Sequence, residues 1–283
     1  MPSAGEGVIF KRSAGGGAFD PGTRALYSRG VRTWAGPVLV AFVALGLPAE
    51  PAAASPPPDV GAILDGVDDL YRGRSSHGTL TMYVVKSTGT RDLTLEQWSK
   101  GADRFSMRIL SPEKERGIAT LVIANDAWSW FPKVTQVTRL TASMLAAPWM
   151  GSHLTNNEIV KRARLARDYT ASKSFEGERD GLKVVDITCD AKPEAAVVWS
   201  RVVVTVRQSD AVPVKMAYFD EAKRLKQTVT FTNEKTLGGR TLPATIRFVN
   251  ADKPEELTEV RWNSLQFDVD IPDARFSLRA LQR

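Results

Sequence analysis

The chain has 283 residues, of which 25% are charged and 43% hydrophobic, and this composition is typical of an ordinary globular protein. The formal net charge of +6 is too small to indicate a nucleic-acid-binding protein, although it suits contact with anionic lipid head groups. The single cysteine, Cys189, excludes a disulfide within the chain. We therefore expect a fold that its hydrophobic core holds together, with no nucleic acid as a partner.

The first 54 residues carry the features of an export leader. Two arginines precede a short apolar run at residues 34–47, and three alanines ending at Ala54 follow it. A basic end, a short apolar middle and small residues at the cleavage site are typical of a secretory signal peptide, so we expect cleavage near Ala54. The alternative is an uncleaved membrane anchor, for which the apolar run is short. Residues 55–58 then form a Pro-rich linker, and residues 59–283 are predicted to form a single domain.

The predicted domain begins with a helical pattern and continues with strands. Val60, Ile63, Leu64 and Val67 lie on one face of a helix. From residue 78 onward, apolar and polar residues alternate in many short segments that turn residues separate. This period of two predicts one dry face and one wet face, which antiparallel sheets allow. The sequence therefore predicts a mainly β domain with a minor α part: a curled, incompletely closed antiparallel β-barrel with an N-terminal helix and a helical or loop cover.

An apolar, methionine-rich segment interrupts the strands between residues 144 and 154. It carries almost no charge and is broken by Pro148 and Gly151. It is too short to span a bilayer and too interrupted for a plain core helix. Two interpretations remain open: a movable cover over an apolar cavity, for which methionine is well suited, or an ordinary loop packed on the core.

A second helical pattern follows this segment, at residues 156–167. Thr155 and Glu158 have the spacing of a capping box at its start. The helix also carries Lys161, Arg162 and Arg164, which predict a peripheral contact with a membrane or a partner protein. The alternative is that these cations belong to a solvated helix face.

The residue types that catalysis requires are nearly absent. The two histidines, His77 and His153, are far apart and have no serine–acid arrangement around them. The sequence has no G-x-S-x-G elbow, no metal-ligand spacing and no phosphate-binding glycine loop in the predicted domain. Cys189 alternates with Val185 and Ile187, which predicts a buried thiol. We therefore expect no enzyme activity, no metal and no cofactor.

Two stretches of the chain resemble the outer membrane lipoprotein-sorting protein family, a LolA-like superfamily of periplasmic carriers. The residues of the first stretch are Trp128, Pro132, Lys133, Val137, Arg139, Met150, Gly151, Ser152, Leu154 and Thr155. The residues of the second are Asp270, Ile271, Pro272, Asp273, Phe276, Ser277 and Leu281. One departure is that Asn156 and Asn157 stand where the family usually has an acidic residue, ahead of Glu158.

The resemblance implies an exported protein of a Gram-negative periplasm that binds or carries lipid, or the acyl chains of a lipoprotein, in an apolar cavity. The alternative is a non-catalytic interaction module that works with an inner-membrane transporter. Alternation and the resemblance together predict which residues contact the lipid. The candidate wall residues are Phe105, Met107, Trp128, Trp130 and Leu140. The candidate cover residues are Met144, Leu145, Trp149 and Met150. A hollow is expected between the two sets.

Overall fold

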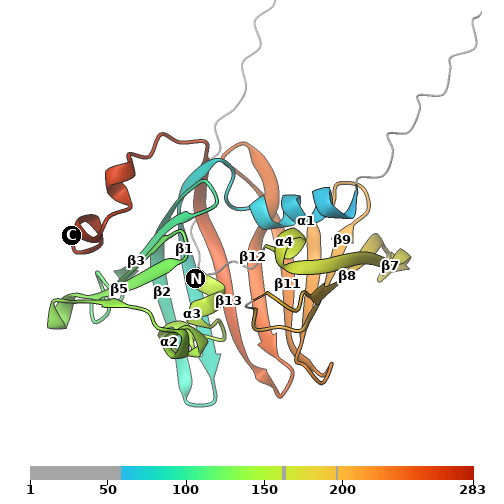
Figure 1. The fold of residues 1–283 in the computed structure, drawn as a ribbon, viewed down its shortest axis with the longest axis horizontal. Helices are drawn as coiled ribbons and strands as arrows, with labels where there is room; N and C mark the ends of the chain where they lie inside the picture. The colour runs from blue at the N-terminus through green and yellow to red at the C-terminus, as the bar shows by residue number, and fades with distance from the viewer. Residues whose placement is uncertain (1–58, 161–163, 196) are drawn as a thin grey trace, which may run out of the picture. The chain divides into compact units, whose positions relative to one another are not determined.

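A computed structural model describes residues 59–160, 164–195 and 197–283, and Figure 1 shows their arrangement. The predicted leader, its cleavage site at Ala54 and the linker at 55–58 lie outside the described residues, as do Lys161 and Arg162. No helix in the described ranges has both the length and the apolar character needed to cross a membrane.

The described residues form one large antiparallel sheet with a few short helices. The strands of its first half are β1 (Ser75–Lys86), β2 (Gly89–Lys100), β3 (Arg104–Ser111), β4 (Ala119–Ile123), β5 (Asp126–Phe131) and β6 (Gln136–Arg139). Those of the second half are β7 (Tyr169–Arg179), β8 (Leu182–Ala191), β9 (Arg201–Arg207), β10 (Pro213–Phe219), β11 (Leu225–Leu237), β12 (Arg240–Asn250) and β13 (Lys253–Phe267). The helices are α1 (Val60–Asp69), η1 (Pro132–Val134), α2 (Ala142–Ala146), η2 (Trp149–Gly151), α3 (Asn156–Val160), α4 (Leu165–Asp168), η3 (Asp273–Arg275) and α5 (Leu278–Leu281).

The strand order is β6-β5-β4-β3-β2-β1-β13-β12-β11-β10-β9-β8-β7. Every pair except β1 with β13 joins strands that follow each other in the chain. The sheet is not closed, and its two edge strands, β6 and β7, are consecutive in sequence. The prediction of a mainly β domain with a curled, unclosed antiparallel sheet is confirmed.

Turn chemistry explains why several of these strands pair as tight hairpins. Asp180 and Gly181, between β7 and β8, both have positive φ angles, as do Gly238 and Gly239 between β11 and β12. Two consecutive residues of this kind match the right-handed twist of the flanking strands.

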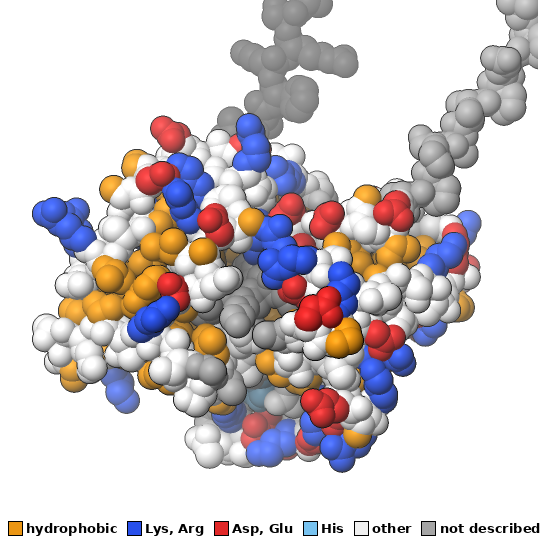
Figure 2. All heavy atoms as spheres, in the orientation of Figure 1, with side chains coloured by type: hydrophobic (Ala, Val, Ile, Leu, Met, Phe, Trp, Pro, Cys, Tyr) orange, Lys and Arg blue, Asp and Glu red, His pale blue; other side chains and the backbone are white. Residues whose placement is uncertain are grey.

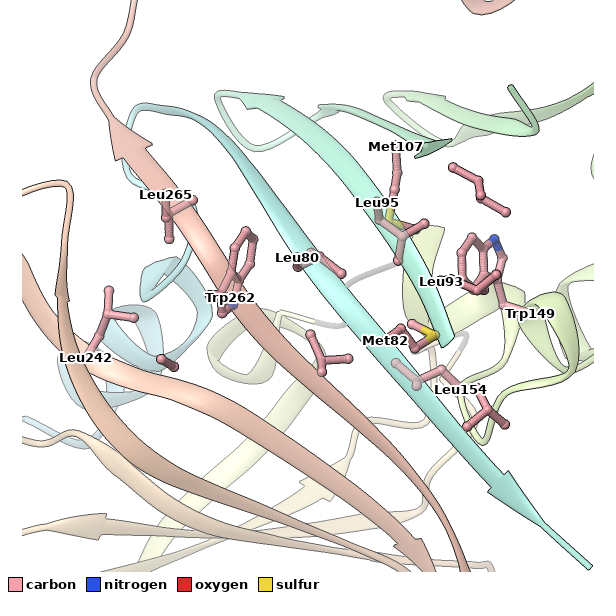
Figure 3. Close-up of a cluster of buried hydrophobic side chains, with 14 residues drawn as sticks. Leu80, Met82, Leu93, Leu95, Met107, Trp149, Leu154, Leu242, Trp262 and Leu265 are labelled. Carbon is pink, nitrogen blue, oxygen red and sulfur yellow. The ribbon is translucent and has the colours of Figure 1, made fainter. Parts of the chain in front are cut away.

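Two hydrophobic clusters lie on one face of the sheet, which we call the inner face. The first cluster contains Leu80, Met82, Val84, Leu93, Leu95, Met107, Ile109, Trp149, Leu154, Leu242, Ala244, Val260, Trp262 and Leu265, and Figure 3 shows most of these side chains. The second contains Ile63, Leu64, Val67, Leu165, Tyr169, Val185, Ile187, Cys189, Val202, Val204, Val206, Met216 and Val229. Ile246 and Phe248 contact both clusters. The predicted helical face of α1 is therefore buried against the second cluster.

The opposite, outer face carries a third cluster over strands β4 and β5. Ala119, Leu121 and Trp130 are buried there against Ile271, Phe276 and Leu281. We call residues 268–283, which contribute these last three side chains, the C-terminal segment. This segment covers one end of the outer face, and Figure 1 shows it beside β3 and β5.

Candidate functional site: the cover segment

The chain passes from one edge of the sheet to the other between β6 and β7. We call the described residues 140–160 of this passage the cover segment; it contains α2, η2 and α3. Because β6 and β7 are the two edge strands, the connection between them must cross the sheet. It crosses on the inner face, since Trp149 and Leu154 belong to the first hydrophobic cluster. The strand order thus explains why an apolar segment lies where the sequence predicts a cover.

Trp149 is the central side chain of the cover segment. It is 4% exposed and packs in the cluster that contains Leu93, Leu95 and Met107 (Figure 3). Its indole Nε1 donates a hydrogen bond of 3.4 Å to Thr120 Oγ1 on β4. The indole is therefore packed against the inner face of the sheet.

A tight loop positions Trp149 and Leu154 toward the sheet. The N–H of Trp149 donates to Leu154 O at 2.7 Å, and Ser152 N–H donates back to Trp149 O at 2.9 Å. Met150 and Gly151 have positive φ angles of 48° and 71°, which close the loop. Gly151 adopts this left-handed conformation without steric cost, whereas Met150 adopts it at some cost in strain.

A buried polar group holds the far end of this loop to β13 and β11. Thr258 Oγ1 accepts from the backbone N–H of His153 at 3.0 Å and lies 2.8 Å from its Nδ1. Gln227 Nε2 donates to His153 O at 2.9 Å, and His153 Nε2 lies 3.6 Å from Glu256 Oε2. We call these four residues (His153, Gln227, Glu256 and Thr258) the latch.

Protonation in the latch follows from these contacts. The Thr258 hydroxyl accepts from the backbone and can donate its own proton to Nδ1, which leaves the imidazole proton on Nε2, facing Glu256. Burial lowers the pKa of His153, with a further contribution from Lys86. The hydroxyl and backbone N–H of Ser87 lower the pKa of Glu256 to about 2. At neutral pH the latch therefore contains a neutral imidazole beside a carboxylate.

Glu158 holds the other end of the cover segment. Its Oε2 accepts from Thr155 N–H at 2.7 Å and from Thr155 Oγ1 at 2.9 Å, while Glu158 N–H donates to Thr155 Oγ1 at 3.1 Å. The predicted capping box is confirmed. The remaining oxygen, Oε1, accepts from the indole of Trp199 at 3.1 Å, so Glu158 also ties the cover segment to the second half of the sheet. Asn156 Nδ2 donates to the carbonyls of Met144 and Ala147, which joins α2 to α3.

The predicted wall residues divide between the two faces of the sheet. Phe105 and Met107 belong to the inner face with Trp149, and Leu140 packs there with Val122 and Ala127. Trp128 and Trp130 lie on the outer face in the third cluster. The alternation within β5 is as predicted, but its tryptophans face the C-terminal segment, because Leu121 on the paired strand β4 has the same orientation.

The predicted cover residues also have different environments. Trp149 is buried and Met150 packs against the same cluster. Leu145 packs against Val122 and Ala127, while Met144 is 38% exposed. Arg164, predicted as a membrane contact, donates its backbone N–H to Asp168 Oδ2 at 3.1 Å.

The sheet residues that receive the cover segment were not predicted. Trp262, Val260, Thr258 and Glu256 follow one another on a single face of β13 with a period of two. This alternation is visible in the sequence, but nothing local indicates that Thr258 and Glu256 contact His153.

The space beneath the cover segment is occupied by Trp149 and Leu154 (Figure 3). Two hollows, of about 410 and 630 Å³, lie elsewhere, against the C-terminal segment on the outer face. The hollow that the sequence predicts under the cover segment stays a prediction, and Trp149 and Leu154 pack against the sheet at this place. In the described ranges, no three His, Cys, Asp or Glu side chains are grouped so that they could hold a metal ion.

Comparison with known proteins identifies the fold. A family model described as "-like: Uncharacterized protein" matches residues 101–283. The chain belongs to this family. No curated protein matches the chain.

Three solved structures are similar over most of the domain. A DUF1329 family protein from Desulfovibrio piger has a TM-score of 0.72 and 22% identity, covering 81% of this chain and 100% of its own. An outer membrane lipoprotein-sorting protein domain from Vibrio parahaemolyticus has a TM-score of 0.68 and 18% identity, covering 78% and 97%. A LolA superfamily protein from Nitrosomonas europaea has a TM-score of 0.65 and 22% identity, covering 77% and 97%. The domain therefore has the LolA-like fold, as the sequence resemblance predicts.

Proposed function

We propose that this LolA-like protein is an exported, periplasmic carrier or binding protein for lipid or for the acyl chains of a lipoprotein. The ligand chain lies on the inner face of the sheet, beneath the cover segment. The observation that carries the proposal is the position of Trp149, an apolar side chain on a short loop that packs against the inner face. The likeness to a lipoprotein-sorting domain supports the same function.

Binding is an exchange of one apolar occupant for another. Expelling Trp149 exposes about 150–250 Å² of apolar surface, which costs about 4–6 kcal/mol. Expelling Leu154 costs about 2 kcal/mol more. An acyl chain of about sixteen carbons contributes about 0.8 kcal/mol for each buried methylene, or about 12 kcal/mol in total. The exchange is favourable, and closure of the cover segment over the empty sheet provides part of the free energy for release.

The proposal requires no chemistry at the site. The protein acts without cofactor or metal, and its partners are the lipid or acylated lipoprotein and an inner-membrane transporter complex that loads it. The polar groups of the latch hold the cover segment in register; they do not react with the ligand.

The test is uptake of a fluorescent fatty acid by the W149D/M150D variant. Two carboxylates on the loop disfavour its apolar position and so free the inner face for the ligand. We therefore expect uptake to rise by at least about tenfold relative to wild type. The matched control is L225D/L278D, which adds the same charge at two exposed apolar positions outside the cover segment. Uptake that stays the same in W149D/M150D contradicts the cover assignment.

Native mass spectrometry after gentle purification separates carriage from the alternative function. Co-purified lipid supports carriage. A folded protein that is empty and takes up no fatty acid favours a non-catalytic interaction module.

A further inference from the structure

The larger of the two hollows is lined by residues that have no part in the proposed carrier function. It measures about 630 Å³ and lies between β3, the loop before β4, η1 and the end of the C-terminal segment. Its lining includes three arginines, Arg108, Arg116 and Arg283, and no acidic residue among the described residues. Trp130 and Pro132 provide an apolar wall. A hollow of this volume is in the range of small-molecule sites.

The three arginines differ in how far they are already engaged. Arg108 Nη2 donates to the carbonyls of Ala280 and Leu281, both at 3.0 Å, which fixes the guanidinium beneath the C-terminal segment, and Glu96 is its partner residue on β2. In the part of the chain that the structure describes, neither Arg108 nor Arg283 has a carboxylate within ion-pair distance. Arg116 pairs with Glu113 at 2.9 Å, and this pair is well exposed and therefore weak.

An exposed apolar side chain lies close in the chain to the lining of the hollow. Val134 comes two residues after Pro132 in η1 and is 63% exposed. Figure 2 shows hydrophobic side chains gathered at the side of the molecule that carries β3 and β5, with Lys and Arg side chains beside them. Apolar side chains next to a cationic hollow are typical of proteins that contact a membrane surface.

We propose that this hollow binds the phosphate of an anionic phospholipid head group, while Val134 enters the membrane interface. Guanidinium groups bind phosphate oxygens with paired, charge-assisted hydrogen bonds, and three arginines line this one hollow. A free phosphate shares this chemistry, but the apolar wall and the exposed Val134 favour the lipid. The site lies on the outer face, opposite the cover segment, so lipid binding there does not require the cover segment to open.

The experiment compares two variants of the full chain that lose the same charge in the same two segments. R116Q/R283Q removes two arginines from the lining of the hollow. K114Q/R279Q removes two exposed cations from the same loop and from α5, and neither of these lines the hollow. Both are measured by sedimentation with vesicles of equal parts phosphatidylcholine and phosphatidylglycerol, and by calorimetry with dihexanoyl-phosphatidylglycerol, sn-glycerol 3-phosphate and inorganic phosphate. Circular dichroism checks that each variant is folded.

We expect R116Q/R283Q to lose about tenfold or more in vesicle affinity and K114Q/R279Q to lose clearly less. The short-chain lipid is expected to bind more tightly than either soluble phosphate. Equal losses in the two variants would show a non-specific charge effect and overturn the site. Equal affinity for inorganic phosphate and for the short-chain lipid would overturn the lipid as the ligand. Fatty-acid uptake is expected to be unchanged in R116Q/R283Q, so the outcome is separate from that of the carrier proposal.

Discussion

Replacing Trp149 with alanine tests how the cover segment is held on the inner face. Trp149 is 4% exposed, so almost all of its apolar surface is removed from water. At about 25 cal/mol per Å², burial of 150–250 Å² corresponds to about 4–6 kcal/mol. The loop can relax into part of the vacated space, and the 3.4 Å hydrogen bond to Thr120 contributes little. We therefore expect W149A to lose about 3–5 kcal/mol of unfolding free energy.

The same substitution should strengthen ligand binding. The ligand no longer has to expel an indole from the inner face, so the affinity for a fluorescent fatty acid is expected to rise by at least about tenfold. Indole added to W149A should raise its melting temperature, because a vacated apolar site binds a matching apolar molecule. Urea unfolding and fatty-acid titration measure the two effects.

The matched control is F276A, which removes a buried aromatic side chain from the outer face. It should cost a similar free energy and leave fatty-acid affinity unchanged. A loss below about 1 kcal/mol in W149A, or equal affinities in the two variants, would refute the proposed role of Trp149.

Three further predictions concern stability. Burial lowers the pKa of His153, so the unfolded chain takes up the proton first and stability falls as pH drops below about 6.5. H153Q should remove this part of the pH dependence in thermal unfolding. Glu256, with its pKa near 2, affects stability only below about pH 4.5. Burial raises the pKa of Asp68 from 3.8 to about 7, so the fold loses stability as pH rises between these two values and no further above them. D68N should gain about 1–3 kcal/mol at pH 8 and nothing at pH 4, and an equal gain at both values would contradict this assignment. A Cβ on Gly78 would clash with the backbone oxygen of Ser264, so G78A should lower the melting temperature. Gly66 has open space in α1, so G66A should add about 0.5–1 kcal/mol to the free energy of unfolding. A stabilised G78A and a destabilised G66A would contradict the packing described.

The local elements were largely predictable because their signals are local. The period of two in β3 and the spacing of Ile63, Leu64 and Val67 in α1 each follow from which face meets the core. Pro132 begins η1 directly after β5, because proline has no N–H to donate to a ladder. The buried thiol of Cys189 is confirmed, and burial raises its pKa to about 12.

The arrangement of these elements in space was less predictable from the sequence. The pairing of β1 with β13 joins residues such as Leu80 and Trp262, and no short-range pattern specifies a partner so distant in sequence. Alternation in β5 shows that Trp128 and Trp130 share a face, but it does not show which face is the inner one. The latch depends on this same long-range pairing, because it brings Glu256 and Thr258 opposite His153 only after β13 is placed in the sheet.

The most direct test of the central claim is to lock the cover segment with a disulfide. Thr258 Oγ1 lies within 3.0 Å of two atoms of His153, so the two side chains are close enough for a H153C/T258C cross-link across the latch. H153S/T258S is the control, since it removes the same contacts without forming a bond. We predict that oxidised H153C/T258C does not take up a fluorescent fatty acid and that reduction restores uptake to the level of H153S/T258S. Equal uptake by the oxidised and reduced forms would contradict opening of the cover segment as the step that admits the ligand.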